Sequence, residues 1–154
     1  MTGFLALFHG WRYRSEFCTK VTLGPYFKAF PEDQAGWITR RREVTDRYKD
    51  DPYCGFIFTL NGYYTLAELT LRAGSRRRIA DIPRELPMFI LSGEEDPVGE
   101  MGKGVRRMYE LYKACGMKNV RLDIRPGDRH ELHNEEDRYQ VFEEIKDFIL
   151  KGGA

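Results

Sequence analysis

Residues 87–150 alternate between short apolar runs and longer amphipathic segments, and this alternation restricts the fold more than any other feature of the sequence. Residues 88–91 form a continuous apolar run bounded by turn residues, which is typical of a parallel strand covered on both faces. Val120, Leu122 and Ile124 alternate with polar residues, as in a strand with one covered face. A helix-length segment separates the two runs, so we expect two parallel strands in an α/β sheet.

Two helices are predicted around the second strand. Apolar side chains recur every three or four residues over 105–115, and Gly116 stands where a left-handed residue commonly ends a helix. After the second strand, Asn134 can cap a final helix. The apolar positions of that helix are Val141, Phe142, Ile145, Phe148 and Ile149.

The first half of the chain has a different texture and predicts helices and loops. Residues 31–50 place apolar side chains at near-helical spacing, and the helix is expected to start at Pro31-Glu32-Asp33. A second helix is expected up to Gly74. The basic run at 76–78, followed by Pro83 and Pro87, reads as a linker. The predicted domains are therefore 1–82 and 83–154.

The composition excludes several classes of protein. The net charge of the 154 residues is +1, so nothing global favours nucleic acid or an anionic membrane surface, and the basic runs at 40–42 and 76–78 read as solvated faces. No stretch reaches the roughly 20 apolar residues of a membrane span. The odd number of cysteines without CxxC spacing suits reduced thiols. We expect a cytoplasmic protein with no integral membrane segment and no nucleic-acid partner.

No cofactor or metal site is predicted. The pattern His130-Glu131-Leu132-His133 is one residue short of HExxH, and the preceding Pro-Gly-Asp turn argues against the helix that such a zinc site needs.

The candidate catalytic residues are Asp96 and His130, which lie in the loops that follow the two predicted strands. The carboxyl ends of parallel strands meet at one edge of a sheet, where ligands bind. A carboxylate that faces a histidine ring fixes its tautomer and supports proton transfer. Simpler interpretations remain open: Asp96 can be a turn or cap residue before Pro97, and His130 can be a loop histidine bonded to nearby backbone.

These loops also carry a family resemblance. Residues 86–99, 102–105 and 126–131 resemble the C-terminal part of the α/β-hydrolases called lysophospholipases or monoacylglycerol lipases, the serine aminopeptidase-like group. Segments of the first half resemble the cap of that family: 13–15, 24–27, 36–40 and 51–56. The resemblance implies a partial α/β-hydrolase fold, in which a helical cap precedes the last parallel strands and helices. It also implies that Asp96 is the triad acid, that His130 is the triad base, and that the complete enzyme acts on a small lipid or ester.

The sequence departs from this family in lacking the Gly-x-Ser-x-Gly nucleophile. None of Ser15, Ser75 and Ser92 has glycine at both −2 and +2, and the three cysteines fail the same test. His9 stands in a His-Gly pair like that of the family's oxyanion strand, but cap-like residues follow it directly, so it reads as an ordinary cap residue.

We therefore expect a fragment of a serine ester hydrolase that is inactive alone, with its N-terminal half lost or encoded elsewhere. That half, or a second copy of the chain, is a candidate partner. The alternative is a non-catalytic module that binds a ligand or a protein. Six aromatic residues of the first half are expected either to line an acyl pocket under a lid or to belong to the hydrophobic core. They are Phe27, Phe30, Trp37, Phe56, Phe58 and Tyr64.

Overall fold

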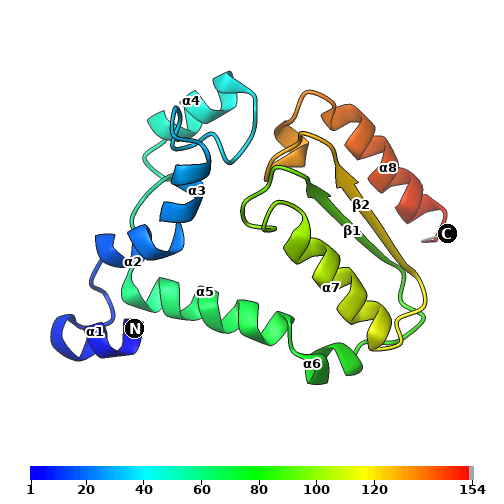
Figure 1. Ribbon diagram of the computed structural model, residues 1–154, viewed down its shortest axis with the longest axis horizontal. Helices are drawn as coiled ribbons and strands as arrows, with labels where there is room; N and C mark the ends of the chain where they lie inside the picture. The colour runs from blue at the N-terminus through cyan, green and yellow to red at the C-terminus, as the bar shows by residue number, and fades with distance from the viewer. Residues whose placement is uncertain (153–154) are drawn as a thin grey trace.

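The computed structural model describes residues 1–152, which form a helical region followed by a strand, a helix, a second strand and a helix (Figure 1). The helical region contains α1 (Thr2–His9), α2 (Glu16–Thr22), α3 (Gly24–Ala29), α4 (Arg42–Asp50), α5 (Leu60–Ala73) and α6 (Arg76–Ala80). The second part contains β1 (Met88–Gly93), α7 (Lys103–Ala114), β2 (Val120–Arg125), the 3-10 helix η1 (Leu132–Asn134) and α8 (Arg138–Leu150).

Side-chain hydrogen bonds cap two helices of the first part. The hydroxyl of Ser15 accepts a hydrogen bond from the backbone nitrogen of Cys18 and so caps α2. The hydroxyl of Thr59 caps α5 in the same way. The two helices pack through a small core of Cys18, Leu60 and Tyr63, all buried. This packing gives the helical region a core separate from the strands.

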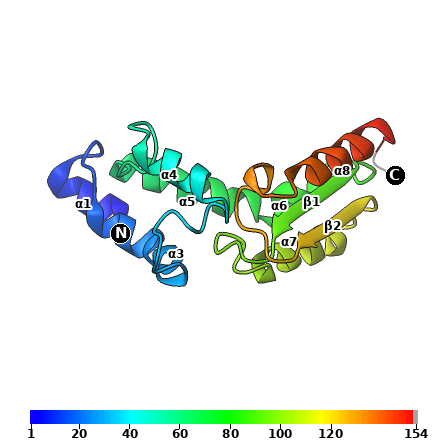
Figure 2. The same ribbon diagram turned by 90° about the horizontal axis from the view of Figure 1, so that it is seen from above.

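The two strands are parallel, as the sequence predicts, and their register places Met88 opposite Val120 and Gly93 opposite Arg125. Helices α7 and α8 lie on opposite sides of the strands (Figure 2). Gly116 has φ +87° just after α7, so the predicted left-handed helix end is confirmed. The carboxyl ends of both strands point toward the helical region (Figure 1).

The strands are less covered than the apolar run at 88–91 predicts. Those four side chains are half-buried, and only Ser92 and Gly93 of β1 are buried. Within residues 1–152, β1 pairs with β2 alone, so its other edge has no partner strand. With a neighbouring strand on one edge only, the side chains of β1 have fewer packing partners, which explains their partial burial.

The predicted helix over 31–50 is wrong in its first half, because α4 begins only at Arg42. The side chain of Asp33 accepts a hydrogen bond from the backbone nitrogen of Ala35. The backbone carbonyl of Asp33 accepts another from the backbone nitrogen of Gly36. These bonds close turns instead of a helix. The turns continue to Ile38, whose backbone nitrogen donates to the carbonyl of Ala35 at 3.0 Å.

Two other boundaries differ from the prediction. The basic run at 76–78 is part of the short helix α6, although its side chains are exposed as expected. The final helix begins at Arg138, with Asp137 as its N-cap residue, so Asn134 does not cap it. Asn134 instead ends the 3-10 helix and donates a side-chain hydrogen bond to Glu131.

None of the helices formed by residues 1–152 combines the length and the apolar character needed to cross a membrane.

Candidate active site

Asp96 and His130 lie in contact at the carboxyl edge of the strands. The Nδ1 atom of His130 is 3.0 Å from Oδ2 of Asp96, which is hydrogen-bond distance. Asp96 follows β1 by three residues and His130 follows β2 by five. The contact expected from the two loops is therefore present, whereas the catalytic role of the pair stays a prediction.

Asp96 also accepts hydrogen bonds that close the turn after β1. Its Oδ1 atom accepts a hydrogen bond from the backbone nitrogen of Val98 at 2.8 Å, and its carbonyl accepts one from Met101 at 2.9 Å. Its residue surface is only 7% exposed. Asp96 is therefore a turn residue whose other oxygen faces the ring, so its place in the turn does not conflict with the predicted triad role.

The ring of His130 is oriented by Asp96 and by an aromatic neighbour. The hydrogen bond from Asp96 raises the pKa of His130 above its ordinary value, against the opposing effect of burial. The ring of Trp37 lies with its centroid 5.2 Å from that of His130. Within residues 1–152, no hydrogen bond engages the Nε2 atom of His130, and its side chain is 38% exposed. The imidazole is fixed at one nitrogen and free to exchange a proton at the other.

The backbone on both sides of His130 is tied to the helical region. The backbone nitrogen of His130 donates to the carbonyl of Trp37 at 3.3 Å, and that of Glu131 donates to the carbonyl of Ile38 at 2.8 Å. The guanidinium of Arg129 donates to the carbonyl of Gly36 at 2.7 Å. These tertiary contacts engage the carbonyls of residues 36–38, which form turns ahead of α4.

Buried acids and Arg40 extend this contact. Nη2 of Arg40 is 2.5 Å from Oδ1 of Asp128, and Nε of Arg40 is 3.1 Å from Oε2 of Glu135. Asp128 and Glu135 are 1% and 0% exposed. Burial would lower the pKa of the Arg40 guanidinium, but the hydrogen bond and the charge of Glu135 raise it. Arg40 therefore pairs with two buried acids, while its own side chain stays 38% exposed.

A second arginine supports the same loop from β2. Nε of Arg125 lies 3.2 Å from Oδ2 of Asp128, and its other nitrogens contact Asp137 and Glu144 on the side of α8. Burial would raise the pKa of Asp137, but the Arg125 hydrogen bond holds it below its ordinary value. Burial raises the pKa of Asp128. The residue before Arg129 is thus anchored from both the sheet and the final helix.

Ser15 and Ser92 make hydrogen bonds to backbone groups close to them in the sequence. Ser15 caps α2, and the hydroxyl of Ser92 donates to the carbonyl of Gly93 at 3.3 Å. His9 ends α1 and stacks on the ring of Tyr13, with centroids 4.5 Å apart. No contact among the described residues links any of these side chains to His130.

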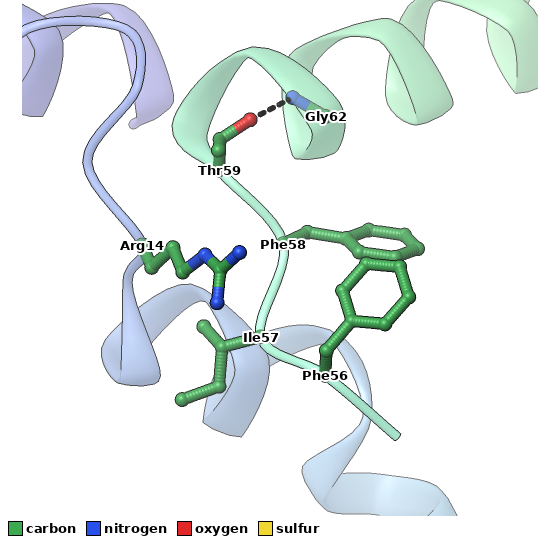
Figure 3. Close-up of a pocket in the computed structure, with 6 residues that line it drawn as sticks. All are labelled: Arg14, Phe56, Ile57, Phe58, Thr59 and Gly62. Atoms are coloured by element: carbon green, nitrogen blue, oxygen red, sulfur yellow. Dashed lines mark hydrogen bonds between the residues drawn. The ribbon is translucent and has the colours of Figure 1, made fainter. Parts of the chain in front are cut away.

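The aromatic residues expected to line one acyl pocket are divided among separate places. Trp37 faces His130, while Phe30 lies under the guanidinium of Arg129. Phe56 and Phe58 contact each other in a pocket of about 240 Å³ before α5, with Arg14 beside Ile57 (Figure 3). Tyr64 packs on Trp11. A single pocket lined by the whole set is not formed by residues 1–152.

Within the described part of the chain, no group of three or more His, Cys, Asp or Glu side chains is arranged to hold a metal ion.

Sequence reasoning missed Arg40 and Glu135. Ninety-five residues separate them along the chain, so no local pattern joins them. Position offered one clue, since Glu135 follows the His130 loop closely and Arg40 lies in a segment that resembles the family's cap.

A model of the family described as "Serine aminopeptidase, S33" matches residues 3–137. Among solved structures, a highly thermostable carboxyl esterase from Bacillus coagulans, in complex with glycerol, is 22% identical with a TM-score of 0.88. A lipase in an open form is 23% identical with a TM-score of 0.87. No protein in the curated set matches the sequence significantly.

The chain spans about half the length of these solved structures. The match covers 99% of this chain but 51% of the esterase and 50% of the lipase. At these identities the likeness concerns the fold.

Proposed function

The chain belongs to the serine aminopeptidase S33 family of α/β-hydrolases, and we propose that it supplies the cap and the acid–base pair of a serine hydrolase that cleaves carboxylic esters. The family match and the structural likeness confirm the family resemblance and the predicted partial α/β-hydrolase fold. The domain division at residues 82 and 83 is part of the proposal, supported by the change from helices to alternating strand and helix.

The observation that carries the proposal is the hydrogen bond between Asp96 and His130 at the carboxyl edge of the strands. Asp96 would hold the proton on Nδ1, so that Nε2 can accept a proton from a serine hydroxyl. The imidazolium formed in this step would be stabilised by the Asp96 carboxylate. The same proton would then pass to the leaving alcohol as the acyl-enzyme forms.

The nucleophile in this proposal lies outside the 154 residues, because none of Ser15, Ser75 and Ser92 stands in a Gly-x-Ser-x-Gly turn. The incomplete coverage of the solved structures supports this. An N-terminal half of the fold would supply the nucleophile, whereas a second copy of the chain could cover apolar surface but has the same serines. The unpaired edge of β1 and the exposed Phe142, Ile149 and Leu150 of α8 offer apolar surface to such a partner.

We extend the proposal to lipid-like esters, such as lysophospholipids or monoacylglycerols, and to a cytoplasmic location. The family resemblance supports the substrate class, and the ring of Trp37 beside His130 offers an apolar wall for an acyl chain. Three free cysteines support a reducing compartment.

The test is to join the chain to the coding segment next to it, if that segment carries a Gly-x-Ser-x-Gly turn, and to measure hydrolysis of p-nitrophenyl esters of increasing acyl length. We expect turnover that His130→Ala and Asp96→Asn each abolish or strongly reduce, while His133→Ala leaves it unchanged. Turnover that survives His130→Ala contradicts the proposal. Neighbouring sequence without such a turn favours the non-catalytic binding module.

A further inference from the structure

Glu135 is a fully buried carboxylate that joins two distant segments of the chain. Its Oε1 atom accepts a hydrogen bond from the backbone nitrogen of Arg129 at 3.1 Å and another from that of Arg40 at 3.2 Å. Its Oε2 atom accepts from Nε of Arg40 at 3.1 Å. One side chain therefore connects the residue before His130 to the helical region.

The same two segments meet along their backbones. The nitrogens of His130 and Glu131 donate to the carbonyls of Trp37 and Ile38. With the bond from Arg129 to Glu135, three consecutive N–H groups around His130 are all held by groups outside their own turn. The position of the imidazole therefore depends on where residues 37–40 lie.

The contact continues to the loop of the acid. Arg40 pairs with the buried carboxylate of Asp128, and the carbonyl of Asp128 accepts a hydrogen bond from the nitrogen of Glu95 at 2.8 Å. Glu95 directly precedes Asp96. Both loops of the proposed pair are thus connected to the Arg40 guanidinium through buried groups.

A carboxylate without exposure is costly unless charge and hydrogen bonds compensate it. Every hydrogen bond that the described residues donate to the Glu135 side chain comes from Arg129 or Arg40. The charge of Glu135 is therefore paired by Arg40 alone, so separating the His130 loop from residues 37–40 would leave a buried carboxylate with only the hydrogen bond from Arg129.

We propose that Glu135 is a positioning residue, which fixes the loop of His130 against residues 37–40 and so keeps the imidazole facing Asp96. The helical region then sets the geometry of the acid–base pair. The inference rests on the proposed function for the role of His130, but the positioning itself is a property of this chain.

The test compares Glu135→Gln with the matched control Glu136→Gln in the full chain. Glu136 is the adjacent acid and is exposed, so its replacement removes the same charge without removing the buried bonds. The readout is the pKa of His130, measured by deuterium exchange at the imidazole C2 position with mass spectrometry. Cleavage after Glu131 separates His130 from His133, and the method does not require a monomer.

We expect Glu135→Gln to lower the pKa of His130 toward its ordinary value, because the ring loses its fixed contact with Asp96, and Glu136→Gln to leave it unchanged. Backbone amides of 128–131 should exchange about tenfold faster or more in Glu135→Gln, as the loss of a charged hydrogen bond implies. Protection of α5 should not change. An unaltered pKa of His130 in a folded Glu135→Gln variant overturns the proposal.

Arg40→Lys changes the other partner of the contact between Arg40 and Glu135. It tests the proposal if Glu135→Gln does not fold. Lysine keeps the charge but cannot bond Asp128 and Glu135 together as the guanidinium fork does. A lowered pKa of His130 supports the positioning role, and an unchanged one overturns it. Neither variant is tested by ester hydrolysis. An inactive assembled enzyme would therefore refute the proposed function, but it would not change the conclusion drawn from the pKa of His130.

Discussion

Gly93 lies so close to Asp128 that a Cβ atom at position 93 would come within 2.3 Å of the Asp128 carbonyl oxygen. The same ideal Cβ would meet the carbonyl oxygen of Arg129 at 2.3 Å. Gly93 ends β1, and Asp128 and Arg129 directly precede His130. The absence of a side chain at Gly93 is what allows the Asp96 loop and the His130 loop to lie together.

Gly93→Ala should therefore loosen the site. Two backbone oxygens would have to move, and overpacking of this kind typically costs about 1–3 kcal/mol of unfolding free energy. Urea denaturation measures the loss. Gly24→Ala is the matched control, because a Cβ there meets nothing within 4 Å. Equal midpoints for the two variants would show that the loops do not approach as closely as the structure has them.

The ion pair of Asp96 and His130 should make stability depend on pH. Because the folded pKa of His130 is raised above 6.5 by Asp96, protonated His130 favours the folded state. This contribution is complete below pH 6.5 and is lost as the pH rises through the folded pKa. Urea midpoints measured across this range should fall as the pH rises. Asp96→Asn should flatten that fall, whereas His133→Gln, at an exposed position, should not.

The sequence predicted the second half of the fold better than the first, for a physical reason. Strand and helix periodicity over 88–125 reflects local packing, and Gly116 takes the φ +87° expected of it. The turns over residues 33–38 also contact distant partners, among them the loop of His130. No pattern within 31–50 contains that information.

Some residues of the candidate site could likewise be predicted from the sequence, and others could not. Asp96 and His130 were found because parallel strands bring their following loops to one edge. Arg40 and Glu135 were missed because the sequence does not indicate that an arginine in a basic run pairs with buried acids. The position of Asp96 and His130 can be predicted from the strand topology. The positions of Arg40 and Glu135 depend on tertiary packing.

Arg125 should be the side chain whose loss most destabilises the second half of the chain. It contacts Asp128, Asp137 and Glu144, and its side chain is 11% exposed. Arg125→Met would remove a cation from these acids, of which Asp137 and Glu144 are partly exposed and Asp128 keeps Arg40, so the loss should stay below the roughly 3–5 kcal/mol of a fully buried pair. Arg121→Met is the control on the same strand, since Arg121 is 49% exposed and should cost about 1 kcal/mol or less. Thermal or urea unfolding of the two variants would rank them, and equal losses would contradict the expectation.

The 154-residue chain by itself should not hydrolyse simple esters. A triad without its nucleophile keeps at most the weak catalysis of an oxyanion hole, and this sequence shows neither part. The measurement is release of p-nitrophenol from a short-chain ester against a matched blank. Turnover abolished by His130→Ala in this chain alone would reveal a nucleophile that the Gly-x-Ser-x-Gly criterion overlooks.

The chain alone should also associate with itself or with a partner. The outer edge of β1 carries no strand within residues 1–152, and Ile149 and Leu150 on α8 are 67% and 74% exposed. At about 25 cal/mol per Å² of apolar surface, several hundred exposed Å² correspond to several kcal/mol, comparable to the stability of a whole domain. Light scattering should therefore report dimers or larger species.

Replacing one apolar residue of this surface should weaken that association. Ile149→Glu places a charge within the apolar stripe formed by Phe142, Ile145 and Leu150, so it should shift the scattering toward monomer. Tyr53→Glu is the control, because Tyr53 is 85% exposed on a loop before α5. A monodisperse, cooperatively melting monomer of the unaltered chain would contradict the prediction, because a fold that leaves this much apolar surface in water would then be stable without a partner. That result would favour the self-sufficient binding module over the incomplete hydrolase.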